Sequence, residues 1–236
     1  MMTPALTSLL AAACFWIFLH FGLAGSPIRT KLAGRLGERT WRGLFALLSL
    51  LGLGWLIWAF HLSQQPENFY GLWLPPEWLL WLPFFVMPFA LLLLVCSLST
   101  RSPTAVGGES ALAAPEPAVG ILRVTRHPML WSFALWAAAH LAANGDFGSI
   151  VLFLAILVVA LGGMPSIDAK RTRAMPEAFA AFTARTSILP FAAILAGRNR
   201  FVFAEIGWGR VGLALALWVA ILILHPYAIG ASAIPG

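Results

Sequence analysis

The hydrophobic and polar positions of the chain alternate in long blocks. Runs of about 20 mainly apolar residues, enough for a helix to cross a bilayer core, are separated by segments rich in Gly, Pro and charged residues. These blocks predict membrane-spanning helices, since a helix of this length matches the thickness of the hydrocarbon layer. Six runs qualify, at 4–25, 43–62, 78–98, 128–143, 149–164 and 211–229.

The fourth and fifth runs are short and are separated by Asn144, Gly145 and Asp146. Residues of these types favour tight turns, so the two runs predict an antiparallel helical hairpin. The segment 99–122 is rich in Ala, Pro and Gly and predicts a flexible linker within a single transmembrane domain over residues 1–236. The predicted fold class is all-α, a polytopic membrane helix bundle of about six transmembrane helices.

Basic residues occur only in alternate loops between the predicted spans. The first, third and fifth loops hold five, three and seven Lys or Arg residues, and the second and fourth hold none. Because cytoplasmic loops carry an excess of Lys and Arg, we expect loops one, three and five in the cytoplasm. With six spans, both termini are then expected on the outer side of the membrane. The 99–122 linker, which belongs to the third loop, is expected on the cytoplasmic side.

Composition favours the same class of protein. Of 236 residues, 60% are hydrophobic and 10% are charged, whereas a soluble domain carries about 25% charged residues. The net charge of +6 would suit nucleic acid, but in a membrane protein it follows from the cytoplasmic loops. We therefore expect membrane lipid as a partner and no nucleic acid. Cys14 and Cys96 lie in apolar runs, so no disulfide framework is expected.

Histidines inside the predicted spans are the main functional candidates, because ionisable residues are costly to bury in a membrane. His20 lies in the first run, and His140 lies in the fourth after Ala137, Ala138 and Ala139. Neutral imidazole is a common ligand of haem iron, and small residues let a bulky group approach a helix closely. Residue chemistry alone leaves haem ligation and ordinary hydrogen bonding between helices equally open.

The depths of the two histidines differ. At about 1.5 Å per residue, His20 lies toward the cytoplasmic end of its span and His140 toward the outer end. Tilt or shifted span limits must bring them level for both to bind one iron. His127 is the alternative partner for His20, since it begins the fourth run on the cytoplasmic side. Arg126 precedes it, and Arg126-His127-Pro128 suits either anion binding at a helix start or anchoring of that helix.

With these motifs the chain resembles the NnrU family of bacterial membrane proteins and, through it, the zeta-carotene isomerases of plants and cyanobacteria. The resemblance runs through most of the chain, in short segments whose order and spacing are specific. The segments are His20–Ala24 with Arg29, Leu36–Arg39 with Arg42 and Leu44–Phe45, Arg123–Met129, Trp136 with Ala139–Leu141 and Asn144–Gly145, Arg185–Ile194, and His225–Pro226 with Gly230–Ser232.

The resemblance implies a bacterial protein, so we expect a multi-pass protein of the inner (cytoplasmic) membrane whose outward-facing termini are periplasmic. It also implies haem b as the cofactor, with His20 and His140 as iron ligands. His127, by its position, and the adjacent Arg126 stay further cofactor-binding candidates. A ligand switch on reduction is implied to free the iron to act on a central cis double bond of a polyene. The isomerases have a Cys three positions before the second histidine, where this chain has Ala137, so the switch here differs or is absent.

Several functions stay open on this reading. The first is a redox-dependent polyene cis-trans isomerase or an accessory of nitrite or nitric oxide reduction, with a hydrophobic small molecule or nitric oxide as partner. The second is a membrane methyltransferase that uses Arg126-His127-Pro128, although only Glu177 stands where such enzymes carry paired Glu residues. The third is a non-catalytic membrane scaffold. No catalytic residue is predicted, and neither the substrate nor the oligomeric state can be read from the sequence.

Overall fold

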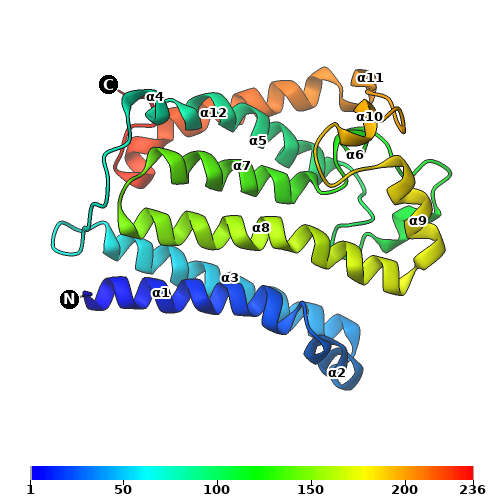
Figure 1. The fold of residues 1–236 in the computed structure, drawn as a ribbon, viewed down its shortest axis with the longest axis horizontal. Helices are drawn as coiled ribbons and strands as arrows, with labels where there is room; N and C mark the ends of the chain where they lie inside the picture. The colour runs from blue at the N-terminus through cyan, green and yellow to red at the C-terminus, as the bar shows by residue number, and fades with distance from the viewer. Residues whose placement is uncertain (1, 236) are drawn as a thin grey trace. The chain divides into compact units, whose positions relative to one another are not determined.

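The computed structural model describes residues 2–235, and within them the chain is all-helical (Figure 1). In this part of the chain, five helices are long and apolar enough to cross a membrane. They confirm five of the six predicted spans. The remaining predicted span, the fourth along the chain, is the apolar helix Pro128–Ala143. Its 16 residues are fewer than the roughly 20 of a typical span. The predicted all-α, polytopic membrane class is confirmed.

The α-helices are α1 (Pro4–Ile17), α2 (Pro27–Leu36), α3 (Glu38–Ser63), α4 (Glu77–Leu80), α5 (Leu82–Ser99), α6 (Ile121–Val124), α7 (Pro128–Ala143), α8 (Phe147–Ala174), α9 (Pro176–Arg185), α10 (Ala192–Leu195), α11 (Phe203–Ile206) and α12 (Trp208–Ile229). A π-helix, η1 (Phe18–Leu23), continues α1, and a 3-10 helix, η2 (Glu109–Ala113), precedes α6.

The fifth span is longer than predicted. The predicted span ends at residue 164, whereas α8 continues to Ala174 and has Pro165 in its interior. The basic residues Arg171 and Arg173 therefore belong to the last turn of α8 rather than to a loop. Cations at a helix C-terminus interact favourably with the helix dipole, which explains why the helix continues through them.

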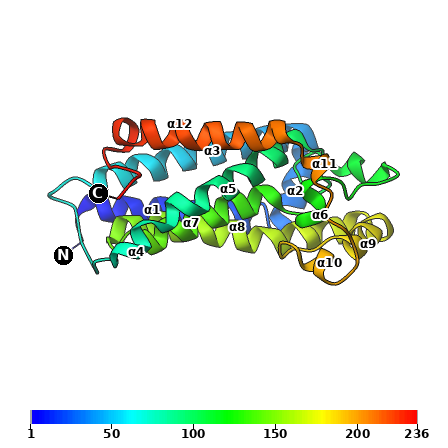
Figure 2. The same ribbon diagram turned by 90° about the horizontal axis from the view of Figure 1, so that it is seen from above.

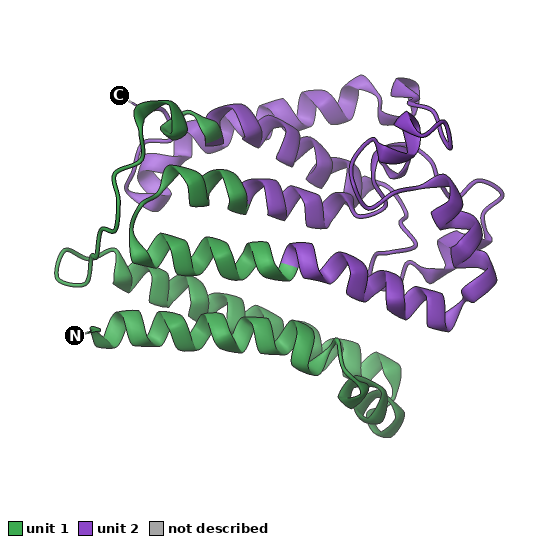
Figure 3. Ribbon diagram, in the orientation of Figure 1, with its two compact units in different colours: residues 1–82, 137–159 green, residues 83–136, 160–236 purple. Residues whose placement is uncertain are grey.

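The chain forms two compact units (Figure 3). Unit 1 comprises Met1–Leu82 and Ala137–Val159, and unit 2 comprises Pro83–Trp136 and Ala160–Gly236. Helices α7 and α8 each contribute to both units. The single-domain organisation and the orientation of the termini in the membrane stay predictions.

Unit 1 is built on the packing of α1 against α3. A Cβ at Gly52 of α3 would lie 3.2 Å from the ring of Phe15 in α1, so this glycine lets the two helices come close. The indole Nε1 of Trp55 donates to the hydroxyl of Ser8 at 3.1 Å, and the Trp55 and Phe15 rings are 5.9 Å apart. Small residues and one polar contact thus join the first two spans.

The turn between α7 and α8 in unit 1 is tight, as predicted. Backbone amides of Leu72 and Trp73 donate to the Gly145 carbonyl, at 2.8 and 3.1 Å. Asp146 Oδ1 accepts the backbone amide of Ser149 at the start of α8 and the side-chain amide of Gln64 after α3. The hairpin is therefore fixed to the loop that follows α3.

Unit 2 contains α5 and α12, which run side by side in both views (Figure 1, Figure 2). Leu91 and Val95 of α5 are buried in one cluster with Ala214 of α12. A second cluster joins α5 to α6 and α11 through buried apolar side chains, namely Cys96, Ile121, Val124 and Ile206. The ends of α5 and α12 thus carry the loops that hold the polar site described below.

The predicted linker 99–122, which lies in unit 2, makes specific contacts. Ala118 is fully buried with Phe179 and Phe182 of α9. Glu109 in η2 pairs with Arg171 at 2.5 Å. The segment therefore packs on α8 and α9, and its flexibility stays a prediction.

Candidate functional site

His20 lies in the π-helix η1, and the contacts of its ring include a hydrogen bond to the backbone and two aromatic neighbours. The Nδ1 atom is 2.8 Å from the carbonyl oxygen of Trp16. Because a carbonyl oxygen only accepts, Nδ1–H donates and Nε2 of the neutral ring is unprotonated. The ring centroids of Trp16 and Phe45 lie 4.4 and 5.6 Å from that of His20. This tautomer is the one in which an imidazole Nε2 can bind a metal.

His140 lies in the last turn of α7. Its ring centroid is 5.2 Å from that of Phe153 in α8, and its carbonyl accepts the side-chain amide of Asn144 at 2.8 Å. Ala137 and Ala139 are buried, at 0% and 2% exposure. Ala138, the third of the alanines expected to admit a planar group, is exposed, so protein covers two of the three.

Unit 1 does not bring the two histidines together. His20 is level with Phe45, near the start of α3, whereas the turn that follows His140 is bonded through Asp146 to Gln64, just after the end of α3. At 1.5 Å rise per residue, these levels differ by about 20 Å along the α3 axis once the position of His140 before the turn is counted. Two axial ligands of one haem iron must lie within a few ångströms of each other, so the predicted pair does not fit a shared haem b in this structure.

The other predicted site residues, Arg126 and His127, form a buried polar cluster in unit 2. Arg126 Nε and Nη2 donate to Oδ2 of Asp168 at 2.9 and 2.6 Å. His127 Nε2 is 2.9 Å from Oδ1 of the same carboxylate, and its side chain is only 1% exposed. An ionised carboxylate only accepts, so Nε2 of His127 carries the proton and offers no lone pair to iron. The anion that Arg126 and His127 hold is the chain's own Asp168.

Asp168 is the site residue that sequence reasoning missed. The predicted fifth span stopped at residue 164, which placed Asp168 in a loop with the basic residues that follow. The basic cluster at 170–173 was itself a signal, since Lys and Arg mark the last turn of a helix. A helix extended to that cluster would have contained a lone acidic residue, which is a functional candidate within a membrane helix.

Two distant segments of unit 2 hold the Arg126–His127–Asp168 cluster in place. The backbone amide of Arg126 donates to the carbonyl of Ser187 at 3.0 Å. The carbonyl of Ile188 accepts both the Thr125 hydroxyl at 2.7 Å and the Trp131 indole Nε1 at 2.8 Å. The third and fifth loops therefore meet at one end of unit 2, and both of them carried family-like motifs.

Among residues 2–235, no group of three or more His, Cys, Asp or Glu side chains is arranged to hold a metal ion. The prediction of a metal therefore concerns haem iron alone. His20 has the required tautomer, His140 lies at another level, and the ring nitrogen of His127 that faces Asp168 is engaged.

Comparison with protein families decides the identity. The model of the family described as NnrU protein matches residues 8–233, nearly the whole chain. The chain belongs to the NnrU family. The segments that carry the resemblance include Arg123–Met129 and Arg185–Ile194, which the structure brings into contact through the hydrogen bonds of Arg126 and Thr125.

Curated relatives of this NnrU protein include the chloroplastic 15-cis-zeta-carotene isomerases of Zea mays and Arabidopsis thaliana. The maize protein is 27% identical over 194 residues, which cover 77% of this chain and 49% of the relative. The Arabidopsis protein is 28% identical over 206 residues, which cover 84% of this chain and 52% of the relative. The chain thus spans about half the length of these relatives. No solved structure matches it.

Proposed function

We propose that this NnrU protein is a membrane-embedded isomerase that acts on a cis double bond of a long apolar polyene. The observation that carries the proposal is the similarity to two zeta-carotene isomerases over 77% and 84% of the chain. The five long apolar helices are consistent with it, because a polyene dissolves in the hydrocarbon layer that such helices occupy. The membrane in question is proposed to be the bacterial inner membrane.

His20 is the residue that we propose to lie at the reaction centre. It combines a partly exposed imidazole of fixed tautomer with the rings of Trp16 and Phe45. Flat aromatic rings suit contact with a flat conjugated chain. The π-helix that contains His20 supports this role, since single π-turns are frequent at functional sites.

Haem b remains a proposed cofactor, and the geometry of unit 1 restricts how it is held. Haem would supply a redox-active iron centre. His20 fits the chemistry of a ligand to that iron, whereas the pair of His20 and His140 does not fit one iron. We therefore propose His20 as the haem ligand in this conformation, and we assign no chemical step to the haem.

The test is co-expression with enzymes that make 15-cis-zeta-carotene, followed by chromatography of the extracted isomers. The wild-type chain is expected to convert this compound to the isomer that lacks the central cis bond, and His20→Ala is expected to abolish conversion. His61→Ala is the matched control, because His61 is an exposed histidine at the end of α3. Correctly inserted wild-type protein that gives no conversion contradicts the proposal and favours the accessory role in nitrite or nitric oxide reduction.

An absorption spectrum of the purified protein tests the cofactor separately. A Soret band that is lost in His20→Ala and kept in His140→Ala supports the single-ligand proposal. Equal loss in both variants would show that the two histidines come together in another conformation, and a colourless protein from haem-replete cells would remove haem from the proposal.

A further inference from the structure

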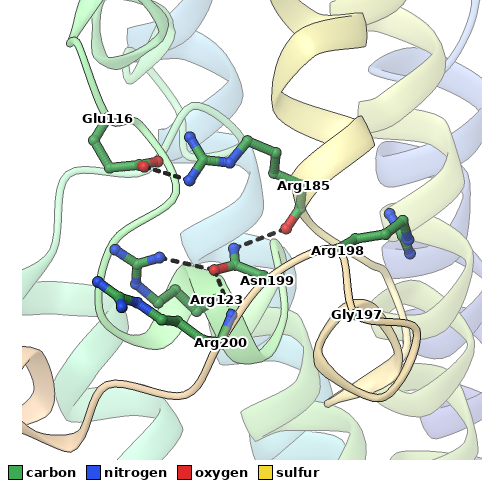
Figure 4. A pocket seen from close by; sticks show the side chains of 7 residues that line it. All are labelled: Glu116, Arg123, Arg185, Gly197, Arg198, Asn199 and Arg200. Atoms are coloured by element: carbon green, nitrogen blue, oxygen red, sulfur yellow. Dashed lines mark hydrogen bonds and ion pairs between the residues drawn. The ribbon is translucent and has the colours of Figure 1, made fainter.

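A cavity in unit 2 is lined mainly by arginine side chains (Figure 4). Its volume is about 400 Å³. The lining comes from the segment before α6, from α6, from the end of α9 and from the loop after α10. The lining residues are Glu116, Arg123, Arg185, Gly197, Arg198, Asn199 and Arg200.

Arg123 is the fixed element of this arginine pocket. Its Nε and Nη2 donate to the two carboxylate oxygens of Glu205 at 2.8 and 2.9 Å. Its Nη1 donates to Oδ1 of Asn199 at 2.8 Å, and Asn199 in turn donates to the carbonyl of Arg185. Hydrogen bonds from Arg123 hold the pKa of the Glu205 carboxyl below its usual range. The pocket wall is therefore preorganised and charged at neutral pH.

The pocket carries more positive than negative charge. Glu205 neutralises Arg123, and Glu116 pairs with Arg185 at 2.5 Å, with side chains 33% and 48% exposed. In the described chain, Arg198 and Arg200 form no ion pair with a carboxylate. Arg198 instead donates to carbonyls at the end of α9, including that of Thr186 at 3.0 Å. The charge of Arg200 also acts on the Glu205 carboxylate, and the four arginines face two carboxylates, so the pocket keeps a net positive charge.

We propose that the arginine pocket binds a phosphate group. Guanidinium groups match the oxygens of phosphate with forked, charge-assisted hydrogen bonds, and a phosphate monoester carries about two negative charges at neutral pH. Arg200, which has no carboxylate in direct contact, supplies the first contact, and Arg185 supplies a second from its exposed ion pair with Glu116; Arg123 supports the wall through Asn199. The cluster of Arg126, His127 and Asp168 takes no part, because its charges are already paired.

The surroundings of the pocket favour a phosphate at the membrane surface. Leu195, Phe201 and Trp208, which flank the 197–200 loop in sequence, are 85%, 48% and 77% exposed. Exposed aromatic and aliphatic residues beside basic ones are typical of segments at headgroup level. The phosphate can belong to the headgroup of an anionic lipid or to a soluble phosphate compound, and both have the same binding chemistry.

The experiment uses the full-length protein in detergent, with phosphatidic acid, phosphatidylcholine and inorganic phosphate as probes and native mass spectrometry as the measurement. Wild-type protein is expected to retain phosphatidic acid in preference to phosphatidylcholine. The double variant Arg185→Gln, Arg200→Gln is expected to bind it at least about tenfold more weakly, since it loses two charged donors of forked hydrogen bonds to phosphate. Arg200 forms no direct ion pair, so the single variant Arg200→Gln is expected to weaken the binding of phosphatidic acid while its melting temperature stays that of the wild type.

Arg173→Gln is the matched control, because Arg173 is an exposed arginine of α8 outside the pocket. If the protein retains phosphatidic acid and inorganic phosphate does not displace it, the ligand is the lipid headgroup. Displacement by inorganic phosphate identifies a soluble phosphate compound. Equal binding by the wild type, Arg200→Gln and the double variant, or no binding of either probe by the wild type, overturns the proposal. Isomerase activity is not used as a readout, so this result is independent of the proposed function.

Discussion

The two units use buried polar side chains in different ways. In unit 1 the polar groups form hydrogen bonds rather than ion pairs: Trp55 of α3 donates to Ser8 of α1, and the carboxylate of Asp146 accepts from the amides of Gln64 and Ser149. In unit 2 they are charged and shared, so that one carboxylate, Asp168, serves both Arg126 and His127. Polar groups of the first kind can be removed with little loss of stability, whereas a buried charge of the second kind depends on its partner.

Asp168→Ala is the strongest test of this contrast. It leaves Arg126 and His127 buried without their carboxylate, and removing one partner of a buried ion pair costs about 3–5 kcal/mol. We expect a large drop in the melting temperature of the purified protein in detergent, measured by thermal unfolding.

The control for Asp168→Ala is Glu67→Ala, which removes an exposed carboxylate from unit 1. It should change stability by no more than about 0.5 kcal/mol. Equal melting temperatures for the two variants would show that the Asp168 cluster is not a stabilising element.

Gly145→Ala tests whether a change to the tight turn of unit 1 costs as much stability as the loss of a buried charge in unit 2. A Cβ at this position would lie 1.9 Å from the carbonyl oxygen of Trp73, so the turn must move. We expect a loss of about 2 kcal/mol, within the range for overpacking of a close contact. Gly43→Ala, whose Cβ would meet no atom within 4 Å, is the control and should leave the melting temperature unchanged or raise it.

Ser8→Ala removes a side-chain hydrogen bond between α1 and α3, which the Trp55 indole donates to the Ser8 hydroxyl. Such bonds between membrane helices contribute about 0.6 kcal/mol on average, so the loss should be small. Ser49→Ala is the control within α3, since the Ser49 hydroxyl is buried without a hydrogen-bond partner in residues 2–235. A Ser8→Ala loss as large as that of Asp168→Ala would remove the contrast between the units.

The smallest expected effect is a pH dependence confined to unit 2. The pKa of Glu205 is lowered in the folded state by its hydrogen bonds with Arg123. Its contribution to stability is therefore complete above the ordinary carboxyl pKa of about 4.3 and is lost as pH falls through the lower, folded-state value. The melting temperature of Glu205→Gln should fall less steeply than that of the wild type between about pH 5 and pH 3. Parallel curves would rule out this linkage.

Local patterns in the sequence were sufficient for the helices and for the tight turn at Asn144–Asp146. Apolar runs of span length and turn residues act over neighbouring positions, so they can be read directly. The different depths of His20 and His140 also followed from their positions in their runs. The predicted end of the fifth span is wrong by ten residues, because basic residues mark loops between spans as well as the last turn of a helix such as α8.

Pairings between distant segments could not be read in this way. Asp168 meets Arg126 from 42 positions away, and Glu205 meets Arg123 from 82 positions away. Nothing in the periodicity of either segment selects the partner, because ion pairs are set by how the helices pack. The motif Arg126-His127-Pro128 was therefore recognised as important, while the carboxylate that completes it was not.

The π-helix at Phe18–Leu23 has a consequence for how chains of this family can differ in length. Each residue of an α-helix advances the direction of the side chains by about 100°, and a π-turn accommodates one additional residue without ending the helix. Deleting one residue between positions 18 and 23 can restore a regular helix at little cost to the backbone. The same deletion rotates the residues that follow it by about 100° relative to α1. If the deleted residue precedes His20, the imidazole of His20 then points away from Phe45. Chain length in this turn thus sets the direction of the imidazole, independently of which residues surround it.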